Sequence, residues 1–517
     1  MIHDACVPLL IGVVGHRDLR PEDEQALAAS FRMIVRTLRA EAPHTPLVLL
    51  SGLSPGAACL AADVALAEDV CLIACLPSAP ERYRREFSDT ASARFEQLLA
   101  AASDVRIDGD DELILHYAQV FVAFWDGVED SENSTAAAVR LRRHGPPHDS
   151  RTRAAFGAAD LGAVYHIWTP HEGNSSAVNV GQLRVLEPGI SRTLQLEERE
   201  SDRGVLKRIE RFNEDSSHVA TPSGDRTVLA PTTVQLEEVA DTLASRFQAV
   251  IRRVTVILFS LAFLSAMAVT LVPGPIVNVP LAGIKIAGIA LAFAIYFYAR
   301  RSDFQNRHQD YRALAEGLRV QAAWSAFGLR DAVYRSYLRF QLGELRWIRE
   351  VLKVTHFFQA PSVGTGDTSW VGLQRHYFQQ AALFNDRKRR RVGVAAGAAG
   401  ILSLCSGIAL LLLEHALKSS SLDNANVRFV LSSLITAGVA AATLTLSYAE
   451  FRGFADSGRR YARMYEIFEL AEEELASTKE PEARAEIMRE TGREALAEQA
   501  QWLVLRRQRP IQVVRAG

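Results

Sequence analysis

Four long apolar stretches mark the second half of the chain. Val254–Val272, Val392–Leu413 and Phe429–Ala449 carry no charged residue over 19, 22 and 21 positions, and helices of that length cross a hydrocarbon core of about 30 Å. A fourth stretch, Pro280–Ala299, has a single charge, Lys285, near its start, where a long side chain can reach the lipid headgroups. The pattern predicts an all-α membrane half with four transmembrane helices.

Basic residues flank these stretches in a regular way. They lie before the first and third stretches and after the second and fourth, at Arg246, Arg252, Arg253, Arg300, Arg301, Arg307, Arg387–Arg391, Arg452, Arg459 and Arg460. Because basic flanks stay on the cytoplasmic side, they predict two hairpins, with both termini and the central segment in the cytoplasm. One apolar stretch alone could be a buried soluble helix, but four with matching flanks favour a membrane.

The first part of the chain alternates strand-like apolar runs with helical periods. Strands are predicted at Leu9–Val14, Pro46–Leu50, Val70–Leu76, Val120–Trp125 and Ala163–Trp168, and helices at Pro21–Ala40, Ala57–Glu68, Ser92–Ala102 and Thr135–Arg143. This alternation is typical of an α/β domain with a mostly parallel, doubly wound, Rossmann-like sheet that has helices on both faces.

Glycine-rich loops follow three of these strands. In such sheets, ligands bind beyond the carboxyl ends of the strands, and glycine lets backbone approach a phosphate closely. A glycine after a strand can also be ordinary turn chemistry, and Arg17 a solvated charge, but three loops at one edge favour binding. The predicted ligand-binding residues are Gly12, Gly15, His16, Arg17, Ser51, Gly52, Gly56, Asp126, Gly127, Asn133, Ser134 and Thr135.

Between these halves the chain is polar and then helical. Residues 171–233 read as a linker with one surface helix, Thr193–Phe212, and from Gln235 a helical period runs straight into the first apolar stretch. This continuity predicts a rigid rod. The expected organisation is a sensing domain at 1–170, the linker at 171–233, two membrane hairpins with their cytosolic helices at 234–350 and 351–480, and a helical tail at 481–517. One soluble helical core is expected from Trp324, Trp347, Phe357 and Trp370 with Leu318, Leu338 and Leu345.

Composition excludes several classes of protein. The chain has 58 Lys and Arg against 60 Asp and Glu, so its charge gives no reason to expect a nucleic-acid partner. Five cysteines without CxxC spacing indicate a reducing compartment and no structural zinc site, with Cys71 and Cys75 packed in the core. Met1–Arg20 lacks the features of a secretory signal, so we expect a cytosolic N-terminus.

The chain shows no sequence signature of catalysis. HExxH, Gx4GK[ST] and GxSxG are absent from the sequence. The histidines His144, His148 and His166 lack metal-ligand spacing, so we expect them to be exposed or locally hydrogen-bonded. No catalytic residue and no metal ligand is predicted.

Three motifs resemble those of the SLOG superfamily. They are Gly12-Val13-Val14-Gly15-His16-Arg17-Asp18-Leu19, Leu49-Leu50-Ser51-Gly52-Leu53-Ser54-Pro55-Gly56-Ala57 and Phe124-Trp125-Asp126-Gly127. This Rossmann-like group is related to the cytokinin-activating phosphoribohydrolases and to DNA-uptake recombination mediators, and the likeness covers about Val7–Pro170. It implies binding of a nucleotide or a nucleotide-derived messenger.

The chain departs from the SLOG pattern in one loop. Related members open the last helix with Gly-Gly-Thr-Ala, whereas this chain has Asn133-Ser134-Thr135-Ala136. The hydrolase branch also has an acidic residue a short way into that helix, and Ala136-Ala137-Ala138-Val139 offers no carboxylate. The resemblance therefore implies a binding domain in which N-glycosidic hydrolysis has no evident general acid or base.

The membrane half is similar to the SLATT group of effectors. The likeness covers roughly Gln235–Ser477 and rests on the hairpins, on the DYRALAEGLR stretch at Asp310–Arg319 and on the helices that follow. Two-helix SLATT effectors accompany SLOG domains and nucleotide-messenger synthases in bacterial conflict systems. The likeness implies assembly of several copies and membrane permeabilisation.

Together the resemblances imply a messenger-gated membrane effector in antiviral defence. The expected ligand is ADP-ribose-like or a cyclic nucleotide, with no certain cofactor. The expected partners are that small molecule, the lipid bilayer and further copies of the chain, in the inner (cell) membrane of a bacterium. Two alternatives stay open. A membrane-anchored nucleotide-processing enzyme is disfavoured by the missing carboxylate, and a non-catalytic membrane scaffold is kept open by the two lost glycines.

Overall fold

The computed structural model describes residues 6–107, 109, 111–128, 134–145, 161–170, 179–188, 201–219, 230–270, 279–338, 343, 345–359, 365–417 and 425–507. The chain forms two compact units. The first unit comprises Met1–Leu243, Arg312–Ala322 and Arg330–Ser362, and the second comprises Ala244–Tyr311, Ala323–Leu329 and Val363–Gly517. Two helices, α8 (Thr233–Thr270) and α10 (Phe304–Phe327), contain residues of both units.

The described strands of the first unit form one sheet of seven, in the order β4-β3-β2-β1-β5-β6-β7. All neighbours are parallel except β6 and β7, which are antiparallel. This confirms the predicted mostly parallel α/β domain. The strands are β1 (Leu9–Gly15), β2 (Leu47–Ser51), β3 (Cys71–Leu76), β4 (Asp104–Ile107), β5 (Val120–Trp125), β6 (Val164–Trp168) and β7 (Leu183–Leu186).

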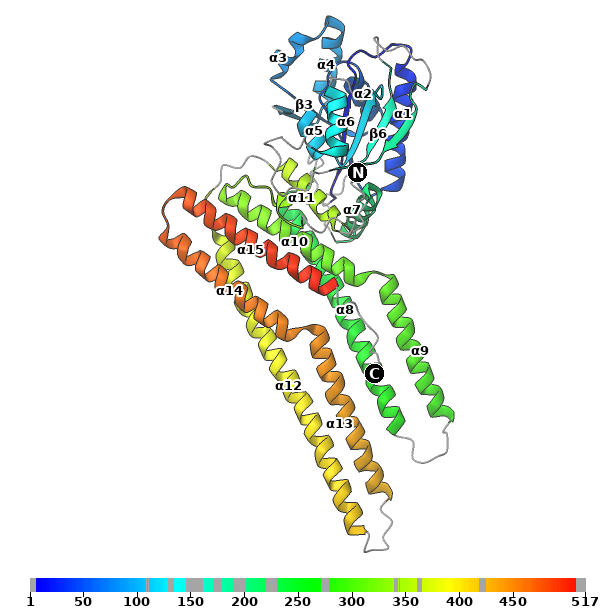
Figure 1. Ribbon diagram of the computed structural model, residues 1–517, viewed down its shortest axis with the longest axis vertical. Helices are drawn as coiled ribbons and strands as arrows, with labels where there is room; N and C mark the ends of the chain where they lie inside the picture. Colours follow the sequence, from blue (N-terminus) through cyan, green and yellow to red (C-terminus); the bar gives the residue numbers. More distant parts are fainter. Residues whose placement is uncertain are drawn as a thin grey trace. The chain divides into compact units, whose positions relative to one another are not determined.

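Helices cover both faces of this sheet (Figure 1). One core joins Ile11 and Phe124 of the sheet to Phe31 of α1 and Phe95 of α4, and the other joins Phe121 to α5 and α6. Strands buried on both faces read as continuous apolar runs, which is why β1, β2, β3 and β5 are visible in the sequence. The helices are α1 (Glu24–Glu41), α2 (Ala57–Ala67), α3 (Pro80–Tyr83), α4 (Asp89–Ala101), α5 (Asp111–Tyr117), α6 (Ser134–His144), α7 (Asp202–Ser217) and α11 (Arg346–Phe358), with 3₁₀ turns η1 (Arg84–Glu86) and η3 (Val333–Arg335).

The region predicted as a linker belongs in part to this core, which corrects the surface helix expected at Thr193–Phe212. Helix α7 buries Leu206, Ile209 and Phe212. Asn213, also on α7, is fully buried, accepts a hydrogen bond from the Val7 N–H at 2.8 Å and donates one to the Val7 carbonyl at 2.9 Å. The linker also supplies the edge strand β7. The sheet therefore extends beyond the strand predicted as its last.

The central segment divides between the units, so the single helical core expected there is wrong. In the first unit, Trp347 of α11 packs against Phe212, with ring centroids 6.0 Å apart, and Phe357 packs against Tyr117 of α5 at 5.0 Å. In the second unit, the Trp324 indole N–H donates to the Met488 carbonyl at 3.1 Å, and Trp370 packs against Phe468. Apolar spacing alone does not say which neighbour a helix face will meet.

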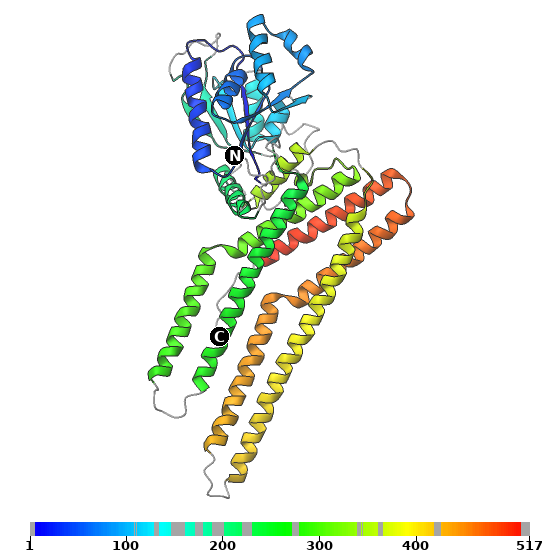
Figure 2. The same cartoon turned by 180° about the vertical axis from the view of Figure 1, so that it is seen from behind.

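Helices are the only regular secondary structure among the described residues of the second unit. Helices α12 and α13 lie side by side and antiparallel (Figures 1 and 2). The Ser403 hydroxyl donates to the Ile435 carbonyl at 2.9 Å, and a Cβ on Gly438 would lie 2.7 Å from the Ala399 carbonyl oxygen, so a small residue lets the backbones approach. Besides α8 and α10, the unit contains α9 (Val279–Arg301), α12 (Ser369–Leu417), α13 (Ala425–Arg452), α14 (Phe454–Ser477) and α15 (Pro481–Arg507).

Among the described residues, three helical spans are long and apolar enough to cross a membrane: Thr233–Met267, Ser369–His415 and Asn426–Ser477. They contain the third and fourth predicted stretches and the part of the first from Val254 to Met267. The predicted second stretch, Pro280–Ala299, lies in α9 and is helical, but the side chains of several of its first residues, Lys285 among them, lie outside the described set. These three helices indicate a membrane protein, and the four spans and their arrangement as two membrane hairpins remain predictions.

Helix α13 ends at a bend that is stabilised by hydrogen bonds from an arginine. Gly453 has φ of +63°, and α14 starts at the next residue. Arg506 of α15 donates to the carbonyls of Phe451 and Arg452 at 3.2 and 3.0 Å, which satisfies acceptors at the end of α13. The bend redirects the chain so that α14 packs antiparallel to the first half of α12, where Phe378 meets Tyr461 and Phe468.

Candidate functional site

The strand order defines a switch point between β1 and β5. From β1 the chain moves outward through β2, β3 and β4, then returns to the other side of β1 with β5. In open parallel sheets, ligands bind beyond the carboxyl ends of the strands at such a point. The residues that directly follow β1 and β5 are His16 and Asp126, both in the set predicted from the sequence.

His16 and Asp126 are in direct contact. The Asp126 backbone N–H donates to His16 Nε2 at 3.1 Å, so Nε2 is the unprotonated ring nitrogen and the imidazole is neutral. Asp126 Oδ1 lies 3.5 Å from the same nitrogen, which in this tautomer is not an ion pair, and it accepts from the Val128 N–H at 3.2 Å. His16 is 7% exposed and Asp126 3%. The pair joins the loop after β1 to the loop after β5 at the switch point.

The loop after β2 is held by its own hydrogen bonds. The fully buried Ser51 hydroxyl donates to the Ala58 carbonyl and accepts from the Leu53 N–H. Gly56 has φ of +80°, and a Cβ there would lie 2.5 Å from the carbonyl oxygens of His16 and Arg17. Ser51 and Gly56 thus shape the loop, whereas Gly52 is half-buried and its Cβ would meet only the Cys75 carbonyl oxygen, at 3.7 Å.

Two of the predicted glycines, Gly12 and Gly15, are required by the packing of neighbouring elements. Gly12 does not lie at the carboxyl edge of the sheet. Gly12 lies inside β1, paired with Leu50 and Phe121, so its expected place in the loop is wrong, and its Cβ would lie 2.6 Å from the Ala118 Cβ. Gly15 ends β1, but its Cβ would lie 2.5 Å from the Ala57 Cβ. Both positions exclude a side chain because neighbouring elements fill the space, not because they leave room for a phosphate.

Three helix N-termini lie near these loops, and they differ in their suitability for an anion. Helix α1 is preceded by Asp23, whose carboxylate pairs with Arg20. In the first turn of α2, the Ala57 N–H already donates to the His16 carbonyl at 3.0 Å and the Cys59 N–H to the Ser54 carbonyl at 3.3 Å. A carboxylate and occupied amides both disfavour an anion there.

Helix α6 is the remaining candidate for anion binding. It starts at Ser134, which is exposed, and continues with buried Thr135 and no acidic residue. Asn133, the third predicted residue of this loop, lies outside the described residues. Gly127, after β5, has φ of +79° and packs against Trp168. The geometry therefore concentrates the candidate site between the end of β1, the end of β5 and the start of α6.

Two residues near this edge, Tyr83 and Asp111, belong to no motif in the sequence. Tyr83 ends α3, after β3, and is buried. Burial raises its pKa to about 12, while the positive charge of exposed Arg17 acts in the opposite direction and Asp111 of α5 raises the pKa further. Arg17 and Asp111 thus each lie within electrostatic range of Tyr83. Their approach depends on the packing of α3 and α5, which local sequence spacing does not contain.

The neighbouring histidine His166 is structural. It is buried in β6, and its Nε2–H donates to the Trp125 carbonyl at 2.8 Å. Burial lowers its pKa, so the ring stays neutral and locally bonded, as predicted. His144 is exposed at the end of α6, and His148 lies outside the described residues.

The described groups at this edge include some that could contact an anion. Helix α6 carries no carboxylate, and Asp126 Oδ1 already accepts a hydrogen bond from the Val128 N–H. Among the described residues, no group of three or more His, Cys, Asp and Glu side chains is arranged to hold a metal ion. Cys75 of β3 is packed in the core, where burial raises its pKa to about 12. An anionic ligand could use the exposed Arg17 and the start of α6.

Comparison of the sequence with protein-family models gives no match, and comparison with curated proteins gives none either.

Proposed function

We propose that the chain is a sensor of a nucleotide-derived messenger that controls a multi-pass membrane effector. The α/β domain would be the receptor, with its ligand at the switch point between β1 and β5. The helical unit would respond by permeabilising the bacterial inner membrane as an assembly of several copies. The resemblance to SLOG and SLATT proteins supports this proposal, and a role in antiviral defence follows from the same resemblance.

The observation that carries the proposal is the continuity of α8. This helix of 38 residues starts at Thr233 in the first unit and continues through the apolar stretch from Val254 to Thr270. A stiff helix can transmit a displacement that a flexible linker would lose. The predicted single rod is incomplete, however, because α10 also contains residues of both units.

Within the first unit, ion pairs clasp α8 to α10. Arg312 donates to Asp241 at 2.7 Å, and Arg319 contacts both Glu237 and Asp241. Glu316, on the same helix as the two arginines, accepts from both of them. We refer to Glu237, Asp241, Arg312, Glu316 and Arg319 as the α8–α10 clasp. It makes the two helices respond together to any change in the first unit.

A membrane-anchored nucleotide-processing enzyme receives less support. Hydrolysis of an N-glycosidic bond needs a positioned acid or base, and α6 has no carboxylate for that role. The scaffold alternative is supported by one observation, the occupied amides at the start of α2. A measurement of ligand binding to the intact protein distinguishes the sensor function from the scaffold function.

The test is ligand-dependent thermal stabilisation of the full chain against a panel of ADP-ribose and cyclic nucleotides. A ligand present at a hundredfold excess over its Kd stabilises the folded state by about 2.7 kcal/mol, which raises the midpoint of unfolding measurably. The full chain is needed because the first unit includes Arg330–Ser362. Stabilisation by one member of the panel supports the proposal, and no response to any member favours the scaffold.

A further inference from the structure

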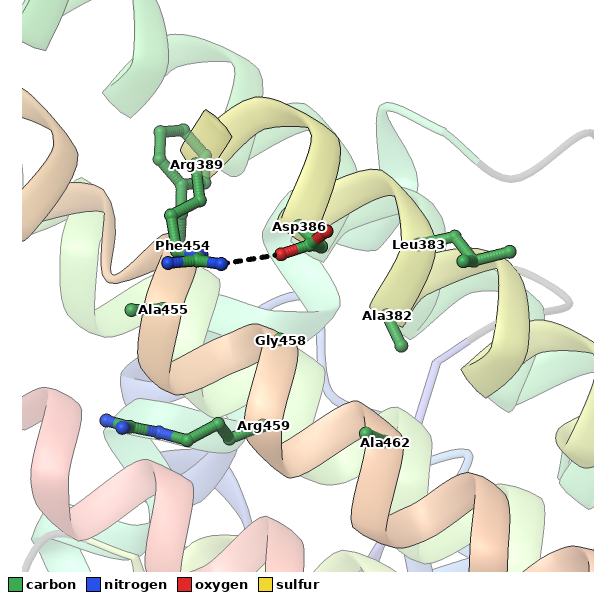
Figure 3. Close-up of a pocket in the computed structure, with 9 residues that line it drawn as sticks. All are labelled: Ala382, Leu383, Asp386, Arg389, Phe454, Ala455, Gly458, Arg459 and Ala462. Carbon is green, nitrogen blue, oxygen red and sulfur yellow. Dashed lines mark hydrogen bonds and ion pairs between the residues drawn. The ribbon is translucent and has the colours of Figure 1, made fainter. Parts of the chain in front are cut away.

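A cavity of about 540 Å³ lies between α12 and α14, next to the bend at Gly453. Figure 3 shows the side chains of both helices that border it. We refer to it as the α12–α14 cavity. Its lining residues are Ala382, Leu383, Asp386, Arg389, Phe454, Ala455, Gly458, Arg459 and Ala462.

The position of these residues relative to the apolar stretches sets the level of the cavity. Arg389 comes three residues before the stretch that starts at Val392, and Phe454 comes five residues after the stretch that ends at Ala449. Because α12 and α13 are antiparallel, both ends lie at the same side of the predicted hydrocarbon core. The cavity therefore lies at the level of the lipid headgroups on the side predicted to be cytoplasmic.

The surroundings of the cavity are strongly basic. Residues 386–391 and 452–463 contain nine basic residues and two acidic ones, Asp386 and Asp456. Asp386 accepts from Arg389 at 2.9 Å and from Arg390 at 2.7 Å, and Asp456 accepts from Arg459 at 2.9 Å. Glu498 also pairs with Arg460. Three carboxylates cannot neutralise nine cations, so the cavity carries a net positive field that favours an anion.

The start of α14 adds to this field. Phe454 and Ala455, in its first turn, line the cavity, and the preceding residue is Gly453, which has no side chain to cap the helix. The N-terminal turn of a helix favours negative charge through its amide groups and dipole. The N-terminal turn of α14 thus borders the same cavity as Arg389 and Arg459.

Gly458 keeps the wall of the cavity open. It lies in the interior of α14, where glycine is less favourable than other residues. Its Cβ would lie 3.7 Å from the Asn385 Cβ, an ordinary contact distance. Helix packing therefore does not require glycine here, and a larger side chain would occupy the cavity.

We infer that the α12–α14 cavity binds the phosphate of an anionic phospholipid. Arg389 and Arg459 would hold the phosphate from two helices, while Leu383 and Phe454 provide apolar walls for the less polar part of the headgroup region. A lipid is favoured over a soluble phosphate because the cavity lies at headgroup level, where lipid is the most abundant phosphate. Basic pockets between membrane helices on the cytoplasmic side are a recognised form of lipid site. The inference is independent of the ligand of the α/β domain.

The test measures phosphatidylglycerol retained by the full chain, by native mass spectrometry after reconstitution with phosphatidylcholine in which about one lipid in five is phosphatidylglycerol. Arg389→Gln and Arg459→Gln should each lower the apparent affinity about fivefold, in line with one cation near a membrane surface. Gly458→Leu should lower it without changing any charge. Arg390→Gln is the matched control, because Arg390 pairs with the same Asp386 and is exposed but does not line the cavity.

Each outcome of this experiment either supports or overturns the lipid site. Loss of retained lipid in the three cavity variants, with Arg390→Gln close to the parent, supports the site. An equal loss in Arg390→Gln would show a diffuse basic surface, and full retention in Gly458→Leu would show that the cavity is not occupied; either result overturns it. Complete displacement of lipid by inorganic phosphate would also overturn it, in favour of a soluble anion. Circular dichroism and thermal midpoints check that all variants fold alike.

Discussion

The backbone N–H of Asp126 donates a hydrogen bond to Nε2 of His16 across 3.1 Å. This bond joins the loop after β5 to the loop after β1, at the point where the strand order reverses. It also fixes the imidazole as neutral, so His16 cannot contribute a positive charge to ligand binding while the bond exists. The cationic contribution from this loop is then left to Arg17, which is exposed.

Gly15→Ala and Gly52→Leu should separate folding from ligand binding. A Cβ at Gly15 would lie 2.5 Å from the Ala57 Cβ, so Gly15→Ala should lower the free energy of unfolding by about 1–3 kcal/mol. A Cβ at Gly52 would meet its nearest atom at 3.7 Å, so Gly52→Leu should retain stability and obstruct a ligand that extends from the switch point onto the loop after β2. Thermal unfolding of the full chain measures both. Gly52→Leu with parental stability and parental ligand affinity would remove this loop from the site.

Stability should fall as the pH decreases below about 6.5. Burial lowers the pKa of His166, and burial together with the Arg335 charge lowers that of His356, from the ordinary value of 6.5. The unfolded chain then binds more protons than the folded one, so the stabilisation is present above 6.5 and is lost as the pH falls through the lowered folded pKa values.

Thermal midpoints across this pH range test the histidine assignment. His166→Gln removes the titrating ring and keeps a donor for the Trp125 carbonyl, so its midpoint should depend less steeply on pH than that of the parent. His144→Gln, at the exposed end of α6, is the control and should behave as the parent does. A His166→Gln profile that overlays the parent would assign the pH dependence to other groups.

Most strands could be predicted from sequence because their environment is uniform. β1, β2, β3 and β5 are buried on both faces and read as apolar runs. β4 is an edge strand with alternating burial and the polar sequence Asp-Val-Arg-Ile, and it carries no such signal. β7 lies in a polar region and is defined only by its pairing with β6.

The candidate site was less predictable because contacts between distant segments determine it. Local sequence identifies Gly12, Gly15 and Gly56 as glycines after or within a strand, but not that Ala118, Ala57 and the His16 carbonyl fill the space beside them. Tyr83 enters the site only through the packing of α3. Local patterns predict which loops share an edge, and tertiary packing decides which groups in them remain available.

Reporter fusions should settle the number of membrane crossings. Four crossings place the N- and C-termini on the same side, whereas three place them on opposite sides. Fusions after Gly173, after Gln341 and at the C-terminus should all report cytoplasm, and fusions near Pro275 and Ser420 should report the outside. Outside signals near Pro275, after Gln341 and at the C-terminus, with a cytoplasmic signal near Ser420, would mean that α9 does not cross.

Gly397→Ile should weaken assembly between chains. A Cβ at Gly393, Gly397 or Gly400 of α12 would have no heavy atom within 4 Å among the described residues, so these glycines do not serve the packing of α12 on α13. Small residues four apart are typical of contacts between membrane helices. In contrast, Gly438→Ile should destabilise the α12–α13 pair itself, because the Ala399 carbonyl lies too close.

Chemical cross-linking of the full chain in liposomes measures this assembly. Gly397→Ile should shift the products toward monomer while its thermal midpoint stays near that of the parent. Gly438→Ile should instead lower the midpoint. Parental cross-linking in Gly397→Ile would show that this face of α12 contacts lipid only.

Ligand-triggered dye leakage from liposomes that carry the full chain tests the central claim most directly. The critical variant combines Glu237→Gln with Asp241→Asn, which cuts the α8–α10 clasp while Glu316 still pairs with Arg312 and Arg319. Glu238→Gln, on the same turn and exposed, is the matched control. A flexible insertion between Thr233 and Gln235 is less informative, because it falls in the first turn of α8 and leaves α10 intact.

The account predicts that the ligand found by thermal stabilisation releases dye from liposomes with the parent and with Glu238→Gln. In the clasp variant, ligand affinity should stay close to parental while leakage is reduced, because a ligand shifts an equilibrium only through its differential affinity for the two states. Full leakage in the clasp variant would contradict coupling through α8 and α10. Ligand binding without any leakage in the parent would contradict the effector function itself.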